Sequence, residues 1–272
     1  LDPSTNYTYR AYVKEDAGKI YGEEKTFTTK DATNYNIRIA ETELTSANTG
    51  AIDSTNFPNL NITKGTITYD LATKTMTLNG VEASTNRSNL IHFYDEEEGK
   101  LVLIGTNTIT SSGNGIRVDS VLTIEGDGSL KATSTNYCGL NVRGTLTIKN
   151  TTVEAIGKWA ISGSTDSDRE CLIIENSTVK ATGSSISMGP FHQFILQDCG
   201  IVQPKGATIE TYDSNGKAVM LNGEVVASEV VIMRVPATVT TGDVYVDLPS
   251  ASAILNGSVD PGTDVITERG FE

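Results

Sequence analysis

The chain has 272 residues, with 25 glycines and only 7 prolines, and its formal net charge of −13 argues against nucleic acid as a partner, because phosphate binding needs clustered Lys and Arg. The longest apolar runs are far too short to cross a membrane, and three cysteines without a C-x-x-C pair argue against a zinc site. No long segment carries a helical apolar period, so the sequence predicts an all-β protein.

The first segment, residues 1–29, contains the run Tyr7-Thr8-Tyr9-Arg10-Ala11-Tyr12 and ends on Lys25-Thr26-Phe27-Thr28-Thr29. In residue type and spacing it resembles the last strands of fibronectin type III-like modules in Bacteroidetes surface proteins. The resemblance implies that residues 1–30 are C-terminal strands of such a module. Because a segment of this length lacks the area for a stable β-sandwich, we expect it to be disordered or to pair with other strands.

Residues 31–235 are predicted to form a parallel β-helix, with an N-terminal cap over residues 36–70. After the cap, apolar triplets recur every 20 to 25 residues or so, which is the period of a solenoid; they occupy residues 76–78, 101–103, 122–124, 146–148, 172–174 and 194–196. A second and a third alternating strand follow each triplet, and residues 218–233 are expected to form the last coil. Three strands per coil predict about six to seven coils, right-handed because such crossovers are right-handed in about 98% of cases.

The corner between the first and second strands of each coil repeatedly carries Asn or Asp. These residues tolerate the left-handed backbone conformation that a one-residue corner needs. They are also expected to hydrogen-bond from coil to coil as a structural ladder, and they are Asn79, Asp127, Asn150, Asn176 and Asp198.

One complete coil runs from Gly115-Ile116-Arg117-Val118 through Leu122-Thr123-Ile124 to Leu130-Lys131-Ala132-Thr133. This pattern resembles a family of bacterial carbohydrate-binding β-helix proteins. The resemblance implies binding of plant polysaccharide and acidic sugars, and an association with calcium. It concerns the coil, so it bears on the fold more directly than on the function.

The third strand of each coil offers the best candidate ligand surface. Planar hydrogen-bonding groups and guanidinium forks suit the hydroxyls and carboxylates of a sugar chain, and aromatic rings stack on sugar rings. The candidate residues are His92, Tyr94, Arg117, Asp119, Asn141 and Arg143 on the strands and Tyr137 and Trp159 at the corners that lead into them. The alternative is a solvated polar face, with Asp119 and Arg143 as a surface ion pair and the rings packed against turns.

Two acidic turns are calcium candidates, because calcium needs several oxygen ligands within close reach. One holds Asp166, Asp168 and Glu170, and the other is Asp95-Glu96-Glu97-Glu98. Neither matches an EF-hand loop, and simple solvation of the acids is the alternative. No other cofactor is predicted.

The last segment, residues 236–272, contains Val239-Thr240, Ala253-Ile254-Leu255-Asn256-Gly257 and Glu268-Arg269-Gly270-Phe271. It looks like the opening strands of the same fibronectin type III-like module, so both flanks are expected to be partial sandwiches. No secretory leader precedes Leu1, and we expect one upstream of this segment of the protein. The expected location is extracellular, at the cell surface.

These features together predict a protein that binds a polysaccharide or other glycan for adhesion or capture. An enzyme is not expected, because a glycosidase needs two carboxylates roughly 5 to 9.5 Å apart, and the candidate face holds one acid, Asp119. His92 and His192 also lack a G-x-S-x-G setting. Two alternatives remain, an adhesive spacer without a small ligand and a polysaccharide lyase or hydrolase.

Overall fold

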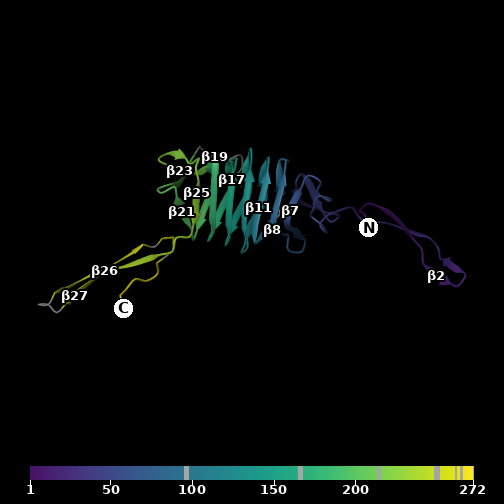
Figure 1. Cartoon of the computed structure of the whole chain (residues 1–272), viewed down its shortest axis with the longest axis horizontal. Helices are drawn as coiled ribbons and strands as arrows, with labels where there is room; N and C mark the ends of the chain where they lie inside the picture. Colours follow the sequence, from purple (N-terminus) through teal and green to yellow (C-terminus); the bar gives the residue numbers. More distant parts are fainter. Residues whose placement is uncertain are drawn as a thin grey trace.

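A computed structural model describes residues 1–94, 98–164, 168–212, 216–247, 252–260, 262–263 and 266–271. The fold is all-β, with 63% of the chain in strands and a solenoid of about five turns built on parallel bridges. In the described residues, no helix long and apolar enough to span a membrane is present. Figure 1 shows the solenoid in the middle of the molecule, with the N-terminal strands extending from one end and the C-terminal strands from the other.

Each coil contributes strands to three parallel ladders. The first ladder contains the start of β8 (Thr75–Thr85), β10 (Glu98–Ile104), β13 (Val121–Glu125), β16 (Thr145–Lys149), β18 (Cys171–Glu175) and β20 (Gln193–Gln197). The second contains the end of β8, β11 (Thr106–Ser111), β14 (Ser129–Ser134) and the first halves of β17 (Thr152–Ser162) and β19 (Thr178–Met188). The third contains β9 (Asn89–Phe93), β12 (Asn114–Val118), β15 (Cys138–Val142) and the second halves of β17 and β19.

The core is a set of in-register apolar stacks along the solenoid axis. Leu122 pairs with Leu146, and Leu146 pairs with Leu172, in successive strands of the first ladder. All three side chains are fully buried, as are Ala132 and Ala155 in the second ladder. The predicted alternation of inward apolar and outward polar residues is therefore confirmed.

The first coil is covered by antiparallel strands. β5 (Asn34–Ile39) pairs with β6 (Thr42–Thr45) and with β9, and β7 (Asn61–Asp70) pairs along β8. Phe57, Leu44 and Leu60 are buried beneath this cap. The cap thus protects the apolar end of the stack and the edges of the first coil from solvent and from pairing with another chain.

The far end differs from the expectation, because residues 218–233 do not form a parallel coil. β20 stacks on β18, but β25 (Val230–Met233) lies antiparallel between β19 and β21 (Gly200–Gln203). β22 (Thr208–Thr211), β23 (Lys217–Leu221) and β24 (Glu224–Val225) form a separate antiparallel sheet. The solenoid has about five turns and not six to seven, because β25 takes the place of β21 beside β19, so the sixth coil is not completed, and residues 218–233 do not add a seventh.

The corner residues follow the predicted conformation in part. Asn150, Asn176 and Asp198 have positive φ angles of 49°, 42° and 51°, and Asn176 Nδ2 donates a hydrogen bond of 2.8 Å to Asn150 Oδ1. At the two earlier corners the left-handed residue is glycine instead, Gly80 beside Asn79 and Gly126 beside Asp127. Glycine adopts positive φ angles without steric cost, so at these two corners the glycine, and not the neighbouring Asn or Asp, has the positive φ angle.

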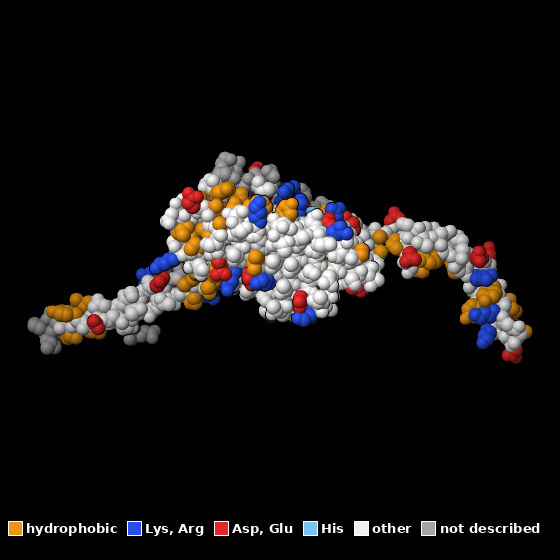
Figure 2. Space-filling model, turned by 45° about the horizontal axis from the view of Figure 1, so that its top comes forward, with side chains coloured by type: hydrophobic (Ala, Val, Ile, Leu, Met, Phe, Trp, Pro, Cys, Tyr) orange, Lys and Arg blue, Asp and Glu red, His pale blue; other side chains and the backbone are white. Residues whose placement is uncertain are grey.

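The flanks are two-stranded antiparallel ribbons. At the N-terminus β1 (Asn6–Tyr9) pairs with β4 (Lys25–Thr28) and β2 (Tyr12–Glu15) with β3 (Gly18–Tyr21), and at the C-terminus β26 (Thr238–Asp247) pairs with β27 (Ser252–Asp260). Large apolar side chains stand in solvent here; Val13 is 63% exposed and Val239 74%. Figure 2 shows hydrophobic side chains along both extended flanks, whereas the visible face of the solenoid is mostly neutral.

Candidate functional site

The third ladder aligns three of the expected ligand residues from coil to coil and continues them with Ser162. His92 pairs in register with Arg117, Arg117 with Asn141, and Asn141 with Ser162. Equivalent positions in neighbouring coils lie about 4.8 Å apart. The predicted column of polar residues therefore exists along the axis, but its members differ in how far they reach solvent.

His92 does not contribute an open binding group. It is only 8% exposed, because β5 of the N-terminal cap pairs with β9 and places Arg38 opposite His92. Its Nε2 atom lies 2.8 Å from Oδ2 of Asp119 on the next coil. His92 thus joins two coils beneath the cap.

Asp119 is the centre of this polar network. Arg117 Nε donates to Oδ1 of Asp119 at 2.9 Å, and the Arg117 Nη2 atom lies 2.9 Å from Oδ2. Burial alone would raise the pKa of Asp119, but the hydrogen bonds from His92 and Arg117 and the Arg117 charge lower it to about 2. The ion pair between Asp119 and Arg143, considered as the alternative to ligand binding, does not form: Asp119 pairs with Arg117, two residues earlier on the same side of the chain.

Tyr94 is held by the N-terminal cap. Its hydroxyl donates to a carboxylate oxygen of Glu43 and accepts from Asn34 Nδ2 at 2.9 Å, and the Arg38 guanidinium lies 4.7 Å from the ring centre. Burial and the bond to Glu43 both raise the pKa of Tyr94. Like His92, Tyr94 is placed in the attachment of the cap to the first coil.

The other candidates gather around one open hollow of about 440 Å³, which we call the arginine groove. Arg117, Tyr137, Asn141, Arg143 and Trp159 line it. Further lining residues, which were not among the candidates named from the sequence, are Asn114, Cys138, Ser162, Gly163, Ser164 and Pro190. An Asn begins the third strand in two coils, Asn89 in β9 and Asn114 in β12, and this repeat was the available signal for Asn114.

Two aromatic rings meet at the arginine groove on neighbouring coils. Tyr137 is 56% exposed and directly precedes Cys138, which pairs in register with Trp159. Trp159 is half-buried, and Lys158 Nζ lies 4.3 Å from its ring centre. The rings thus share one surface with the polar groups and are not both packed beneath a turn.

The polar groups of the arginine groove carry positive charge. Asn141 Nδ2 donates to the carbonyl oxygen of Ser162 at 3.3 Å, which orients its amide. Arg143 is exposed and has no carboxylate partner among the residues that the structure describes. Two arginines and no acid are found in the described lining, so the groove suits a ligand with carboxylate or hydroxyl oxygens.

Cys138 lies in the floor of the arginine groove, 5% exposed, and burial raises the pKa of its thiol to about 11. Burial also raises the pKa of the buried thiols of Cys171 and Cys199. Because the thiolate is the reactive species, we expect none of the three to react readily with a disulfide reagent at neutral pH in the folded protein. All three should react in denaturant, and rapid reaction of one thiol in the folded state would contradict this description.

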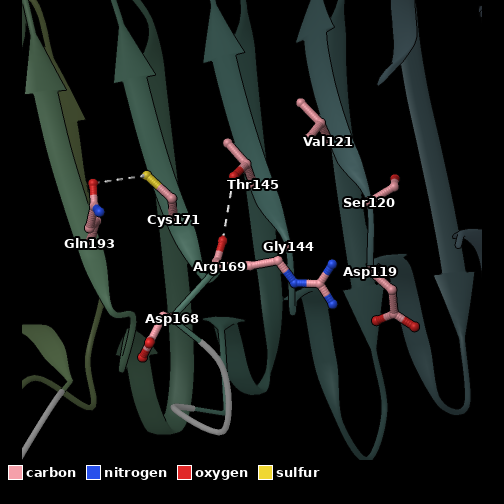
Figure 3. Close-up of a pocket in the computed structure, with 9 residues that line it drawn as sticks. All are labelled: Asp119, Ser120, Val121, Gly144, Thr145, Asp168, Arg169, Cys171 and Gln193. Carbon is pink, nitrogen blue, oxygen red and sulfur yellow. Dashed lines mark hydrogen bonds between the residues drawn. The ribbon is translucent and has the colours of Figure 1, made fainter. Parts of the chain in front are cut away.

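A second hollow of about 440 Å³ lies at another corner, where the third strand leads into the first strand of the next coil. Its lining residues are Asp119, Ser120, Val121, Gly144, Thr145, Asp168, Arg169, Cys171 and Gln193, and Figure 3 shows them spread over several neighbouring strands. In that view Asp119 and Asp168 stand at opposite sides of the hollow. They do not converge on one point.

The calcium candidates are only partly described by the structure. Asp166, Asp95, Glu96 and Glu97 lie outside the described residues. Glu170 is fully buried, and its carboxylate accepts from the Ser164 amide at 3.0 Å and from the Ser164 hydroxyl at 2.6 Å, whereas the side chain of Asp168 is almost fully exposed. Within the described ranges no group of three or more His, Cys, Asp and Glu could hold a metal ion, so calcium binding stays a prediction.

Comparison with known proteins gives no further assignment. No protein-family model, curated protein sequence or solved structure matches the chain. The function must therefore be inferred from the chemistry of the site itself.

Proposed function

We propose that this chain is part of an extracellular, cell-surface protein that binds a glycan in the arginine groove. One observation carries the proposal: an exposed aromatic ring and planar hydrogen-bonding groups line the same open hollow. A ring such as Tyr137 offers an apolar face to a sugar, while the Asn141 amide and the Arg143 guanidinium offer donors to its hydroxyls and carboxylates. These are the two kinds of contact that a sugar ring needs.

The charge of the groove favours an acidic sugar. The Arg143 guanidinium has no carboxylate partner in the described part of the chain and offers a fork of donors that matches a carboxylate, whereas Arg117 is already paired with Asp119. No acid in the described lining would repel an anionic sugar, although the whole chain has a net charge of −13. A uronic acid chain therefore fits this groove better than a cationic glycan does.

The same lining favours binding over cleavage. A glycoside hydrolase needs one carboxylic acid and one carboxylate on either side of the bond that it breaks. The described lining of the arginine groove has neither, and Asp119 is bound by His92 and Arg117 with its pKa held at about 2. A group with such a low pKa is a poor general acid at neutral pH.

We also propose that residues 1–30 and 236–272 belong to fibronectin type III-like modules of the Bacteroidetes type, with the solenoid at residues 31–235 between them. The sequence resemblance of both flanks supports this arrangement. Their two-stranded ribbons with exposed apolar side chains support it further, because isolated ribbons are marginal and need more strands to bury an apolar face.

The test is a screen of acidic and neutral glycans against the full chain, followed by titration of two single variants. Arg143→Ala is expected to weaken binding by about tenfold to a hundredfold, the loss typical of a charge-assisted hydrogen bond. The control is Arg10→Ala, which removes the same charge from the N-terminal flank and should bind like wild type. Circular dichroism of each variant checks that the fold is intact.

Three results would contradict the proposal. Equal loss of binding in both variants would mean that only overall charge matters. Absence of binding to every glycan would favour a spacer without a small ligand. Cleavage of a bound glycan would show an enzyme.

A further inference from the structure

Two more hollows continue the arginine groove along the solenoid. The middle hollow, of about 430 Å³, is lined by Asn86, Arg87, Ser88, Ser112, Gly113, Asn114, Asn136 and Tyr137. It shares Asn114 and Tyr137 with the arginine groove. The third hollow, of about 470 Å³, shares Asn86 and Arg87 with the middle one and is otherwise lined by Pro58, Asn59, Leu60, Asn61, Ser84 and Thr85.

These hollows follow one corner of the solenoid from coil to coil. Arg87 lies between β8 and β9, Gly113 between β11 and β12, and Asn136 between β14 and β15. Each step along the series is thus one coil, about 4.8 Å. A Cβ atom at Gly113 would lie only 2.1 Å from the Ser88 carbonyl oxygen, so the backbones of adjacent coils touch there and no side chain interrupts the series.

The charged residues that line the three hollows all have the same sign, although only Arg87 lies at the corner itself. In the described lining of the three hollows they are Arg87, Arg117 and Arg143, which come from three successive coils. No Asp or Glu is present in that lining, although the chain has 34 acidic residues against 21 basic ones. The three arginines lie one per coil, and from Arg87 to Arg143 they step across the third-strand face as well as along the axis.

Several polar side chains of the corner are held in place by internal hydrogen bonds. Arg87 Nη2 donates to Asn59 Oδ1 at 2.9 Å, Asn136 Nδ2 donates to the Ser112 carbonyl oxygen at 3.0 Å, and Asn114 Nδ2 donates to Asn89 Oδ1 at 2.9 Å. Groups that are already ordered lose less conformational entropy when a ligand binds. The corner is thus a preorganised polar surface.

From this arrangement we infer that the three hollows form one binding track, in which an acidic glycan chain runs obliquely from the third-strand face to the corner beside Arg87 and spans at least three coils. The inference rests on the proposed glycan-binding function and adds the direction of the chain and its minimum extent. A short oligosaccharide occupies the arginine groove, where the two aromatic rings are. A longer chain also reaches Arg87, so affinity increases with chain length.

The test uses calorimetric titration of the full chain with uronic acid oligosaccharides of two lengths, a disaccharide and an octasaccharide. Wild type is expected to bind the octasaccharide at least about tenfold more tightly, the gain from one further charge-assisted contact. Arg87→Gln should remove that gain without changing the affinity for the disaccharide. Asn86 is exposed and lines the middle and third hollows, so Asn86→Glu should do the same by charge repulsion. Arg143→Gln should lower the affinity for both ligands, whereas Arg10→Gln should change neither affinity.

The binding track and the glycan-binding function on which it rests can be contradicted by different results of this titration. If Arg143→Gln weakens binding but Arg87→Gln and Asn86→Glu leave the octasaccharide affinity unchanged, the arginine groove binds glycan and the track is wrong. If no acidic or neutral oligosaccharide binds wild type, both proposals fail. If Arg87→Gln weakens the disaccharide as well, a short ligand already spans the corner and the assignment of separate hollows is wrong.

Discussion

Replacing Leu146 with alanine is expected to lower the free energy of unfolding by about 2 to 5 kcal/mol, the usual cost of removing a large side chain from a close-packed core. Leu146 is fully buried in the fourth coil and stacks in register between Leu122 and Leu172. Because coils on both sides hold their own side chains in place, the cavity cannot collapse easily. Each coil of a solenoid is stabilised by its neighbours, so loss of the Leu146 side chain weakens the packing of the fourth coil against the coils on both sides.

The matched control is the next residue along the strand. Thr147 points outward and is half-buried, so Thr147→Ala should cost less than about 1 kcal/mol, mainly through lower β-propensity. Urea unfolding of both variants, followed by circular dichroism, measures the two changes. A Thr147→Ala variant less stable than Leu146→Ala would mean that the strand is oriented differently.

Replacing Asp119 with alanine is expected to cost about 2 kcal/mol at neutral pH. The carboxylate has a folded-state pKa of about 2 against an ordinary value of 3.8. Each unit of difference between the folded-state and ordinary pKa corresponds to about 1.4 kcal/mol of folding stability. Because the folded-state pKa is the lower one, this stabilisation is complete above the ordinary pKa and is lost as the pH falls from about 4 to 2. The variant also leaves the partly buried Arg117 without its partner.

The pH dependence distinguishes a charge effect from a packing effect. Unfolding free energies of wild type and Asp119→Ala should differ at neutral pH and converge near pH 2, if the protein remains folded there in the absence of denaturant. The control Asp127→Ala, at an exposed corner, should leave stability nearly unchanged at both pH values. If the difference in unfolding free energy between wild type and Asp119→Ala is the same at neutral and acid pH, the carboxylate charge is not the cause of the lost stability.

The repeating part of the fold could be predicted because its physical cause is local and periodic. Every coil must place apolar residues inward at equivalent positions, so triplets such as residues 122–124 and 146–148 mark the register directly. The corners could be predicted for the same reason at Asn150 and Asn176, where both residues have positive φ angles and their side chains are hydrogen-bonded to each other. At the corner that contains Asn79, the neighbouring Gly80 has the positive φ angle. Which of two adjacent residues adopts this conformation does not follow from the presence of an Asn alone.

The end of the solenoid could not be predicted in the same way. An apolar strand such as β25 has the same alternation whether it pairs parallel or antiparallel, and the choice depends on which edge is open to it. Here the open edge is β19, and β25 pairs with it antiparallel, so that β21 pairs with β25 and not with β19. The number of turns follows from that long-range choice and not from the repeat.

The candidate site was predicted as a column but not as an accessible surface. Register alone placed His92, Arg117 and Asn141 in line. Two cap strands about fifty residues earlier in the chain bury His92 and half-bury Tyr94, through Arg38 on β5 and Glu43 on β6. Contacts between such distant segments carry no periodic signal in a single sequence.

The measurement that tests the central claim most directly is a crystal structure of the full chain with an acidic octasaccharide. The account predicts sugar rings against Tyr137 and Trp159, a carboxylate at Arg143, and a chain that continues to the corner beside Arg87. An oligosaccharide bound only in the hollow beside Asp168, or on a flank, would contradict the assignment of the arginine groove as the glycan-binding site.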